Sequence, residues 1–327
     1  MSWQGKNILV TGAGGFIGSH LAERLVREGA QVRAMVHYNA LGKRGWLDFS
    51  PHVDQMEIFP GDICDRDSVN AAMKGIQVVF HLAALIAIPY SYQAPGSYVG
   101  TNVMGTLNVL QSSLGNEVDR VVHTSTSEVY GTAAYVPIDE SHPLQAQSPY
   151  AASKIGADKI AESFHHSFGV PVVTVRPFNT YGPRQSNRAI VPTVITQCLG
   201  SDTVRVGNLH PTRDLNFIED TVNGFLLAAS EPEAVGVTIN LGSGTEISIG
   251  GLVEMISRIL GKQMNTIHEE ERVRPEGSEV ERLLADNSLA RSLIKWESRV
   301  DLEAGLTETI RWYEANMELF RAAEYVV

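Results

Sequence analysis

A tyrosine and a lysine four residues apart, Tyr150 and Lys154, have the types and the spacing that proton transfer needs. They follow Ser148-Pro149, which is typical of a helix start, and residues four apart lie on one face of a helix. An ammonium close to a phenol favours the phenolate and lowers the pKa of the tyrosine. The pair therefore predicts that Tyr150 accepts a proton from a substrate hydroxyl while Lys154 stabilises the charge.

A glycine-rich segment, Gly12–Gly18, follows an apolar strand at Asn7–Thr11 and precedes a helical pattern. Gly12 permits a tight turn, and Gly15 lets the backbone approach a pyrophosphate. Gly18 lets the helix pack close to the strand, so that the helix N-terminus faces the phosphates. Because the segment joins a strand to a helix at the start of a βαβ pattern, it predicts a dinucleotide-binding site.

The end of the second expected strand bears on the choice between NAD and NADP. A site for NAD usually carries an acidic residue there, whereas this strand runs into His37 with no carboxylate. Lys43 and Arg44 follow, either as contacts for a 2′-phosphate or as a solvated loop. Asp62 is assigned to the adenine amino group. The sequence leaves both cofactors open and slightly favours NADP.

The elements around these residues predict an α/β fold. Doubly apolar strands alternating with helices are typical of a Rossmann-type, doubly wound parallel sheet. Closely spaced Gly and Pro after residue 176 predict a smaller C-terminal α/β substrate lobe. We expect a dinucleotide-binding domain at 1–176 and a substrate lobe at 177–327, with segments around 214–241 returning to the first domain. The expected strands are Asn7–Thr11, Val32–Val36, Met56–Phe59, Val78–His81, Arg120–Ser125 and Val170–Val175. The expected helices are Phe16–Arg27, Val69–Met73, Thr101–Leu114, Tyr150–Phe168, Ile190–Leu199, Asp220–Ala229, Ile249–Leu260 and Leu302–Tyr313.

The composition restricts the possible function classes. The chain has 26 Lys and Arg against 37 Asp and Glu, a net charge of −11 that excludes nucleic-acid binding by general charge attraction. Its two cysteines have no metal-type spacing and exclude a disulfide scaffold. The longest apolar stretch, Val78–Pro89, is too short to span a bilayer, and no signal-peptide layout is visible. We expect a cytoplasmic protein without a metal and without a nucleic-acid or membrane partner.

Four motifs together resemble the extended short-chain dehydrogenase/reductases that act on nucleotide sugars. They are Gly12–Gly18, the Tyr150/Lys154 pair, His81-Leu82-Ala83-Ala84 and the segment Arg213–Asp220. The resemblance spans essentially the whole chain. It implies a tightly bound NAD or NADP that is regenerated in each cycle. The implied cofactor contacts are Gly12, Gly15, Phe16, Ile17, Gly18, His37, Arg44, Asp62, Ile63, Leu82, Ala83, Ala84, Asn102, Tyr150 and Lys154.

The segment Thr126-Ser127-Glu128 narrows the reaction that the resemblance implies. Thr126 would bind the sugar hydroxyl that is oxidised, and Glu128 stands where NDP-hexose 4,6-dehydratases carry their base. In that chemistry a hydride leaves C4, and the ketone acidifies the C5 proton, which Glu128 removes. The 6-hydroxyl then leaves and the hydride returns to C6. The sequence is most similar to dehydratases acting on UDP- or GDP-N-acetylglucosamine in legionaminic-type pathways.

Ser127 departs from the dehydratase pattern, which has an aspartate there to protonate the leaving hydroxyl. Serine is a poorer acid, so Ser127 either relays a proton or belongs to different chemistry. A UDP-glucuronate-type decarboxylase, with Arg272 or Arg274 binding the carboxylate, stays open, as do a 5,6-ene-forming dehydratase and a 4-epimerase. A cofactor sensor without turnover is disfavoured because all the catalytic residues are present.

The resemblance also implies a substrate site and a partner. Guanidinium forks match phosphate oxygens, so Arg213 and Arg274 are expected to bind the diphosphate. The helices at Thr101–Leu114 and Tyr150–Phe168 would pair with those of a second copy as a four-helix bundle in a homodimer. The implied substrate contacts are Pro89, Asn179, Arg184, Val191, Arg213, Arg274 and Glu279.

Overall fold

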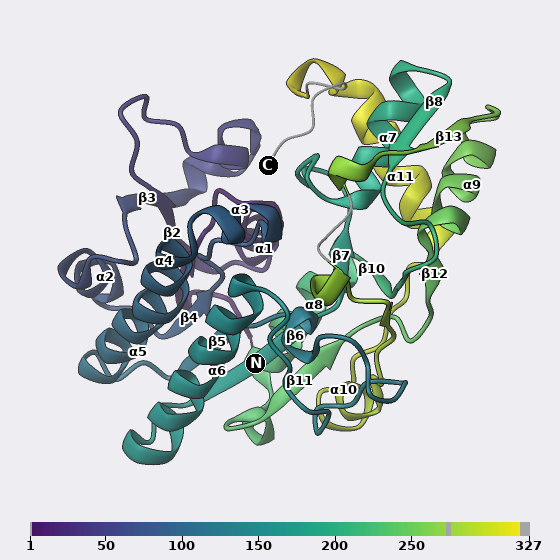
Figure 1. Ribbon diagram of the computed structural model, residues 1–327. Coiled ribbons are helices and arrows are strands. Elements are labelled where there is room, and N and C mark those ends of the chain that lie inside the picture. The colour runs from purple at the N-terminus through teal and green to yellow at the C-terminus, as the bar shows by residue number, and fades with distance from the viewer. Residues whose placement is uncertain (1, 273–275, 321–327) are drawn as a thin grey trace.

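The computed structural model describes residues 2–272 and 276–320 and is organised around a parallel sheet (Figure 1). Within these residues the sheet has seven strands in the order β11–β6–β5–β4–β1–β2–β3, and every neighbouring pair is parallel. The predicted Rossmann-type sheet is therefore confirmed. The strand order reverses between β1 and β4, and α/β proteins bind ligands at such a point. The strands are β1 (Asn7–Thr11), β2 (Gln31–His37), β3 (Met56–Gly61), β4 (Val78–His81), β5 (Arg120–Thr124), β6 (Val172–Pro177) and β11 (Thr238–Leu241).

Helices cover both faces of the sheet (Figure 1). On one face α2 (Arg66–Met73), α5 (Gly105–Gly115) and α6 (Pro149–Phe168) pack side by side. On the other, α1 (Phe16–Arg27) packs against α8 (Ile218–Ser230). Because both faces are covered, every residue of β4 and β6 is buried, which explains why these strands are rich in apolar residues.

The helix predicted at Thr101–Leu114 starts in the structure as a π-helical turn and continues as α5. The turn, Val99–Met104, joins α4 (Pro95–Tyr98) to α5, and α3 (Ile88–Gln93) comes before α4. Asn102 lies in the π-helical turn, and its buried side chain accepts a hydrogen bond from Leu85 N (2.8 Å) and donates one to Leu85 O (2.9 Å). The wider turn lets this side chain leave the helix and bind the chain that follows β4.

The smaller lobe is built from segments of the second half of the chain, and one apolar core runs from the sheet into it. Val10 and Phe80 of the sheet belong to the same buried cluster as Val191 and Val253 of the lobe. β11, which follows much of the lobe in sequence, is an edge strand of the large sheet. The division of the chain near residue 176 stays a prediction. The lobe includes β7 (Asn179–Tyr181), α7 (Ile190–Gly200), β8 (Thr203–Val206), β9 (Thr212–Arg213), β10 (Leu215–Phe217), β12 (Ile247–Ser248), α9 (Ile249–Ile259), β13 (Asn265–His268), β14 (Arg282–Leu283) and α11 (Leu302–Ala315). The short helix α10 (Ser288–Leu293) lies beside β11 of the large sheet.

Two features are absent from the described residues. Among residues 2–272 and 276–320, no helix combines the length and apolar character that a bilayer span requires. The same part of the chain holds no group of three or more His, Cys, Asp or Glu side chains placed to bind a metal ion.

Candidate active site

A large cavity of about 1730 Å³ lies at the carboxyl ends of the sheet strands and extends to the smaller lobe. It is lined by the turn after β1, by the ends of β4 and β5, and by residues of α7, β8 and β9. Sites for one small molecule usually occupy roughly 300–1,000 Å³. The cavity is therefore large enough for a dinucleotide and a second nucleotide-sized ligand together.

The glycine turn forms one end of this cavity. Gly12 has φ of +70°, and a Cβ at this position would lie 2.8 Å from Ala83 N. A Cβ at Gly18 would collide with the carbonyl oxygen of Gly12. Gly15 is the N-cap of α1 and provides no side-chain cap, so the first N–H groups of the helix lie at the cavity wall. This glycine-only cradle at a helix start fits a pyrophosphate.

The loop after β2 forms the outer wall near the glycine turn. Arg44 Nε donates to Asp48 Oδ1 (2.9 Å), and this hydrogen bond is the largest cause of the lowered pKa of Asp48. His37 Nε2 lies 3.7 Å from Asp62 Oδ2 at the ends of β2 and β3. Trp46 N donates to the carbonyl oxygen of Gly14 (2.9 Å), which fixes the loop over the glycine turn. Because Arg44 has a carboxylate partner, its predicted contact with a 2′-phosphate competes with that ion pair.

The first turns of α6 bring Tyr150 and Lys154 to the cavity. Ser148 Oγ caps the helix by accepting a hydrogen bond from Ala151 N (3.1 Å), as the Ser-Pro start predicts. Both side chains are buried, and Lys154 Nζ donates to the carbonyl oxygen of Thr124 (2.6 Å). Burial lowers the pKa of Lys154 to about 8, against the opposing charge of Asp158.

The prediction that Lys154 lowers the pKa of Tyr150 is wrong for the protein alone. Burial raises the pKa of the Tyr150 phenol, and a hydrogen bond from Thr126 opposes that shift only in part. Loss of hydration destabilises the phenolate more than the neighbouring groups stabilise it. Tyr150 therefore holds its proton in the protein alone, and further positive charge must be present when it accepts one from a substrate.

The end of β5 brings the second group of predicted catalytic residues to the same wall. Thr126 and Glu128 both line the cavity, and Thr126 Oγ1 accepts a hydrogen bond from Glu128 N (3.2 Å). Ser127 is only 3% exposed and is not among the described lining residues. Thr126, the extended N-cap of a short 3₁₀ turn, and Glu128 within that turn thus face the cavity, whereas Ser127 between them does not line it.

Asn102 also lies behind the cavity wall and not on it. Its Nδ2 donates to Ser153 Oγ (2.9 Å) on α6 as well as to Leu85 O. Behind it, His81 Nε2 lies 3.1 Å from Thr106 Oγ1, and Thr106 Oγ1 donates to the carbonyl oxygen of Asn102 (2.6 Å). These bonds hold the π-helical turn against α6, so the geometry of Asn102 is that of a supporting residue.

Six of the seven predicted substrate residues line the same cavity. Arg213 lines it, and its guanidinium donates to Glu279 Oε1 (3.3 Å) and to the carbonyl oxygen of Val280 (2.8 Å). Arg184 lines it too, but its guanidinium binds Glu23 on α1 (3.0 Å). Arg274 lies outside the described residues. Pro89, Asn179, Val191 and Glu279 are also lining residues.

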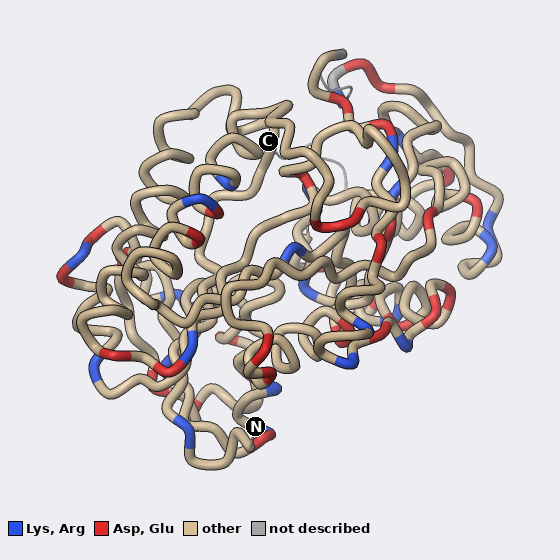
Figure 2. The backbone as a smooth tube through the Cα atoms, turned by 90° about the horizontal axis from the view of Figure 1, so that it is seen from below, with Lys and Arg blue, Asp and Glu red and all other residues tan. Residues whose placement is uncertain are grey.

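The cavity is rich in positive charge although the chain is acidic. Among the described lining residues, eight basic side chains face four acidic ones, while the whole chain carries −11. Elsewhere acidic and basic positions are interspersed along the chain (Figure 2). Positive side chains gathered in a cleft concentrate anionic ligands there. The basic residues are Lys43, Arg44, Lys154, Arg184, Arg188, Arg205, Arg213 and Arg272; the acidic ones are Asp48, Asp62, Glu128 and Glu279.

No sequence motif singles out Arg188, Arg205 or Trp46, which also line the cavity. Arg188 precedes α7 and Arg205 is the exposed residue of β8, and isolated arginines at such positions resemble solvated surface residues. Trp46 packs edge-on against Trp312 of α11, with ring centroids 5.5 Å apart. The folding of the lobe brings Arg188 and Arg205 to the cavity, whereas Trp46 reaches it on the loop after β2, which is bonded to Gly14.

The known proteins that this chain resembles are enzymes that act on nucleotide sugars. Residues 9–309 match the family model described as GDP-mannose 4,6 dehydratase. A dTDP-glucose 4,6-dehydratase of Actinoplanes sp. is 32% identical over 317 residues, 94% of this chain and 98% of that protein. A UDP-glucose 4-epimerase of Mycolicibacterium smegmatis is 32% identical over 312 residues, 93% of this chain and 97% of that protein. The structure of a dTDP-glucose 4,6-dehydratase from Streptomyces venezuelae with NAD bound superposes with a TM-score of 0.87, at 28% identity and covering 97% of this chain and all of that one.

Proposed function

Because the chain belongs to the GDP-mannose 4,6 dehydratase family of extended short-chain dehydrogenase/reductases, we propose that it is an NAD(P)-dependent nucleotide-sugar 4,6-dehydratase. The single observation that carries the proposal is the position of Glu128. Its carboxylate shares one cavity wall with Thr126, Tyr150 and Lys154. Hydride transfer alone needs the last three residues, and a carboxylate beside them supplies the base that elimination needs in addition.

The chain's own residues account for the proton movements. Tyr150 takes the proton of the C4 hydroxyl, which Thr126 orients through its own hydroxyl. Lys154, whose pKa is about 8, is mainly charged at neutral pH and stabilises the phenolate. The nicotinamide, when bound, supplies a reversible hydride acceptor and an additional positive charge.

Elimination then requires a base and an acid. Glu128 removes the C5 proton that the C4 ketone has acidified, which breaks the C5–H bond. Because Ser127 is buried outside the cavity lining, we assign the acid role to Glu128 as well. Its carboxylic acid gives that proton to the 6-hydroxyl, so that the C6–O bond breaks, water leaves and a C5–C6 double bond forms. Return of the hydride to C6 and of a proton from solvent to C5 completes the 6-deoxy product, and Tyr150 releases to solvent the proton that it took from the C4 hydroxyl. The cofactor ends each cycle in its starting form.

A 4-epimerase is the second candidate. The absence of an aspartate at position 127 favours it, and a 4-epimerase is among the relatives with 32% identity. An epimerase uses the same Thr126, Tyr150 and Lys154 chemistry but returns the hydride to C4. It has no need of Glu128 as a base.

The two candidates are separated by mass spectrometry of the products from a panel of UDP-, GDP- and dTDP-sugars. A dehydratase product has lost one water, whereas an epimerase product keeps the mass of the substrate. With UDP- or GDP-N-acetylglucosamine, the proposed substrates, we expect the loss of water. Unchanged mass with every sugar that reacts would contradict the proposal.

A matched set of variants tests the assignment of Glu128. Glu128→Gln should bind the cofactor normally but lose exchange of the C5 proton with deuterated water. Ser127→Ala should keep both exchange and turnover within about tenfold, because its hydroxyl does not face the ligand. Glu254→Gln, an exposed position on α9, is the control for the loss of a carboxylate. Full exchange of the C5 proton in Glu128→Gln would contradict the assignment of Glu128 as the base.

Two finer points belong to the proposal. Neighbouring structures hold NAD, and the lack of an acidic residue at the end of β2 leaves NADP as the proposed preference to be tested by titration. We also propose a homodimer in which α5 and α6 pack against their copies. Met104, Leu114 and Phe168 support it as exposed apolar side chains on or next to these helices. Light scattering that gives the mass of one chain would contradict the dimer.

A further inference from the structure

A buried carboxylate lies one helical turn beyond Lys154. Asp158 of α6 is 5% exposed and accepts hydrogen bonds from three neighbours. Its Oδ1 lies 3.0 Å from His123 Nε2 on β5, and its Oδ2 accepts from Ser125 Oγ at 2.8 Å. Arg176 Nη2 on β6 completes the set at 3.0 Å from Oδ2. One carboxylate therefore binds α6, the end of β5 and β6 together.

These contacts join the two groups of proposed catalytic residues. Tyr150 and Lys154 lie on α6, upstream of Asp158, whereas Thr126 and Glu128 follow Ser125 at the end of β5. Lys154 Nζ also reaches β5, at the carbonyl oxygen of Thr124. A shift of Asp158 would move α6 and the β5 end relative to one another.

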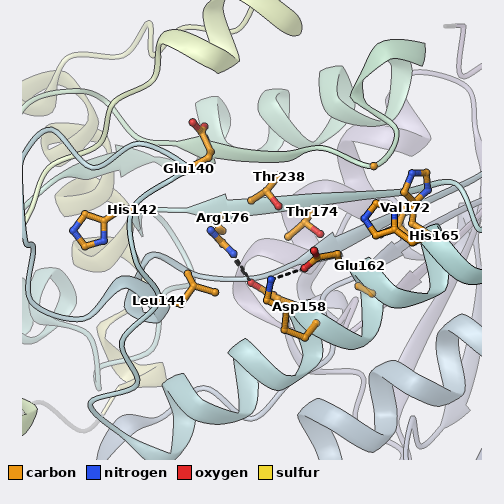
Figure 3. Close-up of a pocket in the computed structure, with 14 residues that line it drawn as sticks. Glu140, His142, Leu144, Asp158, Glu162, His165, Val172, Thr174, Arg176 and Thr238 are labelled. Carbon is orange, nitrogen blue, oxygen red and sulfur yellow. Dashed lines mark hydrogen bonds and ion pairs between the residues drawn. The ribbon is translucent and has the colours of Figure 1, made fainter.

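Asp158 also lies between two cavities. Ser125 and Lys154 line the large cavity, while Asp158 and Arg176 line a separate pocket of about 350 Å³ behind α6. Figure 3 shows the ion pair of Arg176 with Asp158 in this pocket. Asp158 thus lies on the far side of Lys154 from the large cavity and does not line that cavity.

The hydrogen bonds define the charge of this cluster. Burial opposes ionisation of Asp158, but the hydrogen bond from His123 and the charges of Arg176 and Lys154 lower its pKa to about 2. Burial lowers the pKa of His123 and of His81, so both rings are neutral at neutral pH. His123 donates through Nε2, and its Nδ1 has no hydrogen-bond partner among the described residues. The groups around Lys154 from every packed element are Tyr150 and Asp158 on α6, His81 on β4, His123 on β5, Glu128 after β5 and Arg176 on β6.

We propose that Asp158 is a positioning residue for the reaction: its carboxylate sets the register between α6 and the end of β5 and supplies the anion that stabilises the Lys154 ammonium. This inference rests on the proposed function for its kinetic test, but the contacts that carry it do not depend on the substrate. Asp158 is the negative charge that raises the pKa of Lys154 against burial. Arg176 competes for the same carboxylate. Removal of Asp158 should therefore lower the pKa of Lys154, and removal of Arg176 should raise it.

The kinetic test is the pH profile of nicotinamide reduction, followed by absorbance in a single turnover. Activity that needs the Lys154 ammonium falls as pH rises through its pKa of about 8. Asp158→Asn removes the stabilising anion, so the alkaline limb should move to lower pH by about one unit. Ser125→Ala removes one hydrogen bond but keeps the charge; it should lower the rate and leave the limb in place. A merely structural Asp158 would lower the rate without moving the limb.

A second variant, Arg176→Gln, keeps the proposal testable if Asp158→Asn does not fold. Asp158→Asn leaves Arg176 buried without its anion, which is destabilising. Arg176→Gln keeps the carboxylate and removes the competing cation, so the alkaline limb should move to higher pH. An unmoved limb in every folded variant would overturn the proposal.

Titration of Lys154 without substrate separates this inference from the proposed function. NMR of ¹³C-labelled lysine side chains in the cofactor-free protein gives the Lys154 pKa directly, with Lys154→Met identifying the signal. We expect a lower pKa in Asp158→Asn and a higher one in Arg176→Gln than in the unmodified protein. Equal values would refute the role of Asp158 even for an active dehydratase. The expected shifts would support that role even if no nucleotide sugar reacted.

Discussion

The large cavity offers two kinds of lining that we propose hold anionic groups. At the proposed cofactor end the lining is backbone: Gly12 and Gly18 leave no room for a side chain, and the uncapped start of α1 presents its N–H groups. For the proposed substrate end we assign side chains. Four arginines from separate segments line the cavity, namely Arg188, Arg205, Arg213 and Arg272.

This difference decides how each end depends on the rest of the fold. A backbone site is local, because one strand, one turn and one helix form it. A site of guanidinium groups exists only when distant segments pack together, and exposed charges are screened by salt. Ligand affinity at the cofactor end should therefore fall when a side chain is enlarged and should not change with salt concentration. Affinity at the substrate end should fall with added salt and depend less on side-chain volume.

The largest effect is expected where the two ends meet, at Tyr150. Tyr150→Phe removes the hydroxyl that accepts the substrate proton, and loss of a general base lowers the rate by about 10²–10⁴-fold. Neither ligand should lose affinity, because the phenol belongs to neither anion site. Turnover and two separate binding titrations measure this. A large loss of affinity for either ligand would mean that Tyr150 helps to bind that ligand and does not lie between the two sites.

The next effect tests the cofactor end alone. Gly18→Ala places a Cβ against the Gly12 carbonyl, and overpacking of this kind costs about 1–3 kcal/mol. Dinucleotide affinity should fall by up to about a hundredfold, with no change in the binding of a nucleoside diphosphate. Fluorescence titration measures both. The matched control is Gly115→Ala at the end of α5, where a Cβ meets no atom within 4 Å. Equal losses in the two variants would show that helix propensity and not close packing is the cause.

The sequence predicted the backbone-built end well. The bounds of β1 and α1 are those expected, because apolar runs and glycines are local signals. The predicted sheet is confirmed for the same reason. The division into lobes and the roles of the site residues stay predictions, although nearly all of those residues face one cavity.

Prediction failed where a residue's role depends on what packs behind it. The π-helical turn at Val99–Met104 depends on the partner of Asn102 across the chain at Leu85. The raised pKa of Tyr150 follows from burial, which residue spacing does not reveal. Arg184 binds Glu23, and nothing in either segment's sequence links the two.

The third effect tests the substrate end. Arg205→Met removes an exposed cavity-lining charge from β8 without disturbing a buried pair. Affinity for UDP or GDP should fall about tenfold, since hydrogen bonds to charged groups contribute roughly 1.5–3 kcal/mol and exposure lowers that value. The loss should shrink as salt is added, while dinucleotide affinity stays constant. Arg258→Met, whose exposed pair with Glu303 lies outside the cavity lining, is the control. A salt-independent loss would contradict a charge-based site.

The smallest effect tests whether the cofactor end also uses a side chain. Arg44 has its carboxylate partner in Asp48, and exposed ion pairs of this kind contribute about 0–1 kcal/mol. Arg44→Met should therefore change the ratio of NADP to NAD dissociation constants by no more than about fivefold. Arg24→Met is matched to it, because Arg24 pairs with Glu28 four residues on, on α1 and outside the cavity lining. A change well above tenfold in Arg44→Met alone would show that the guanidinium leaves Asp48 for a 2′-phosphate. Both ends of the cavity would then rely on arginine, and the contrast between them would hold only for the pyrophosphate.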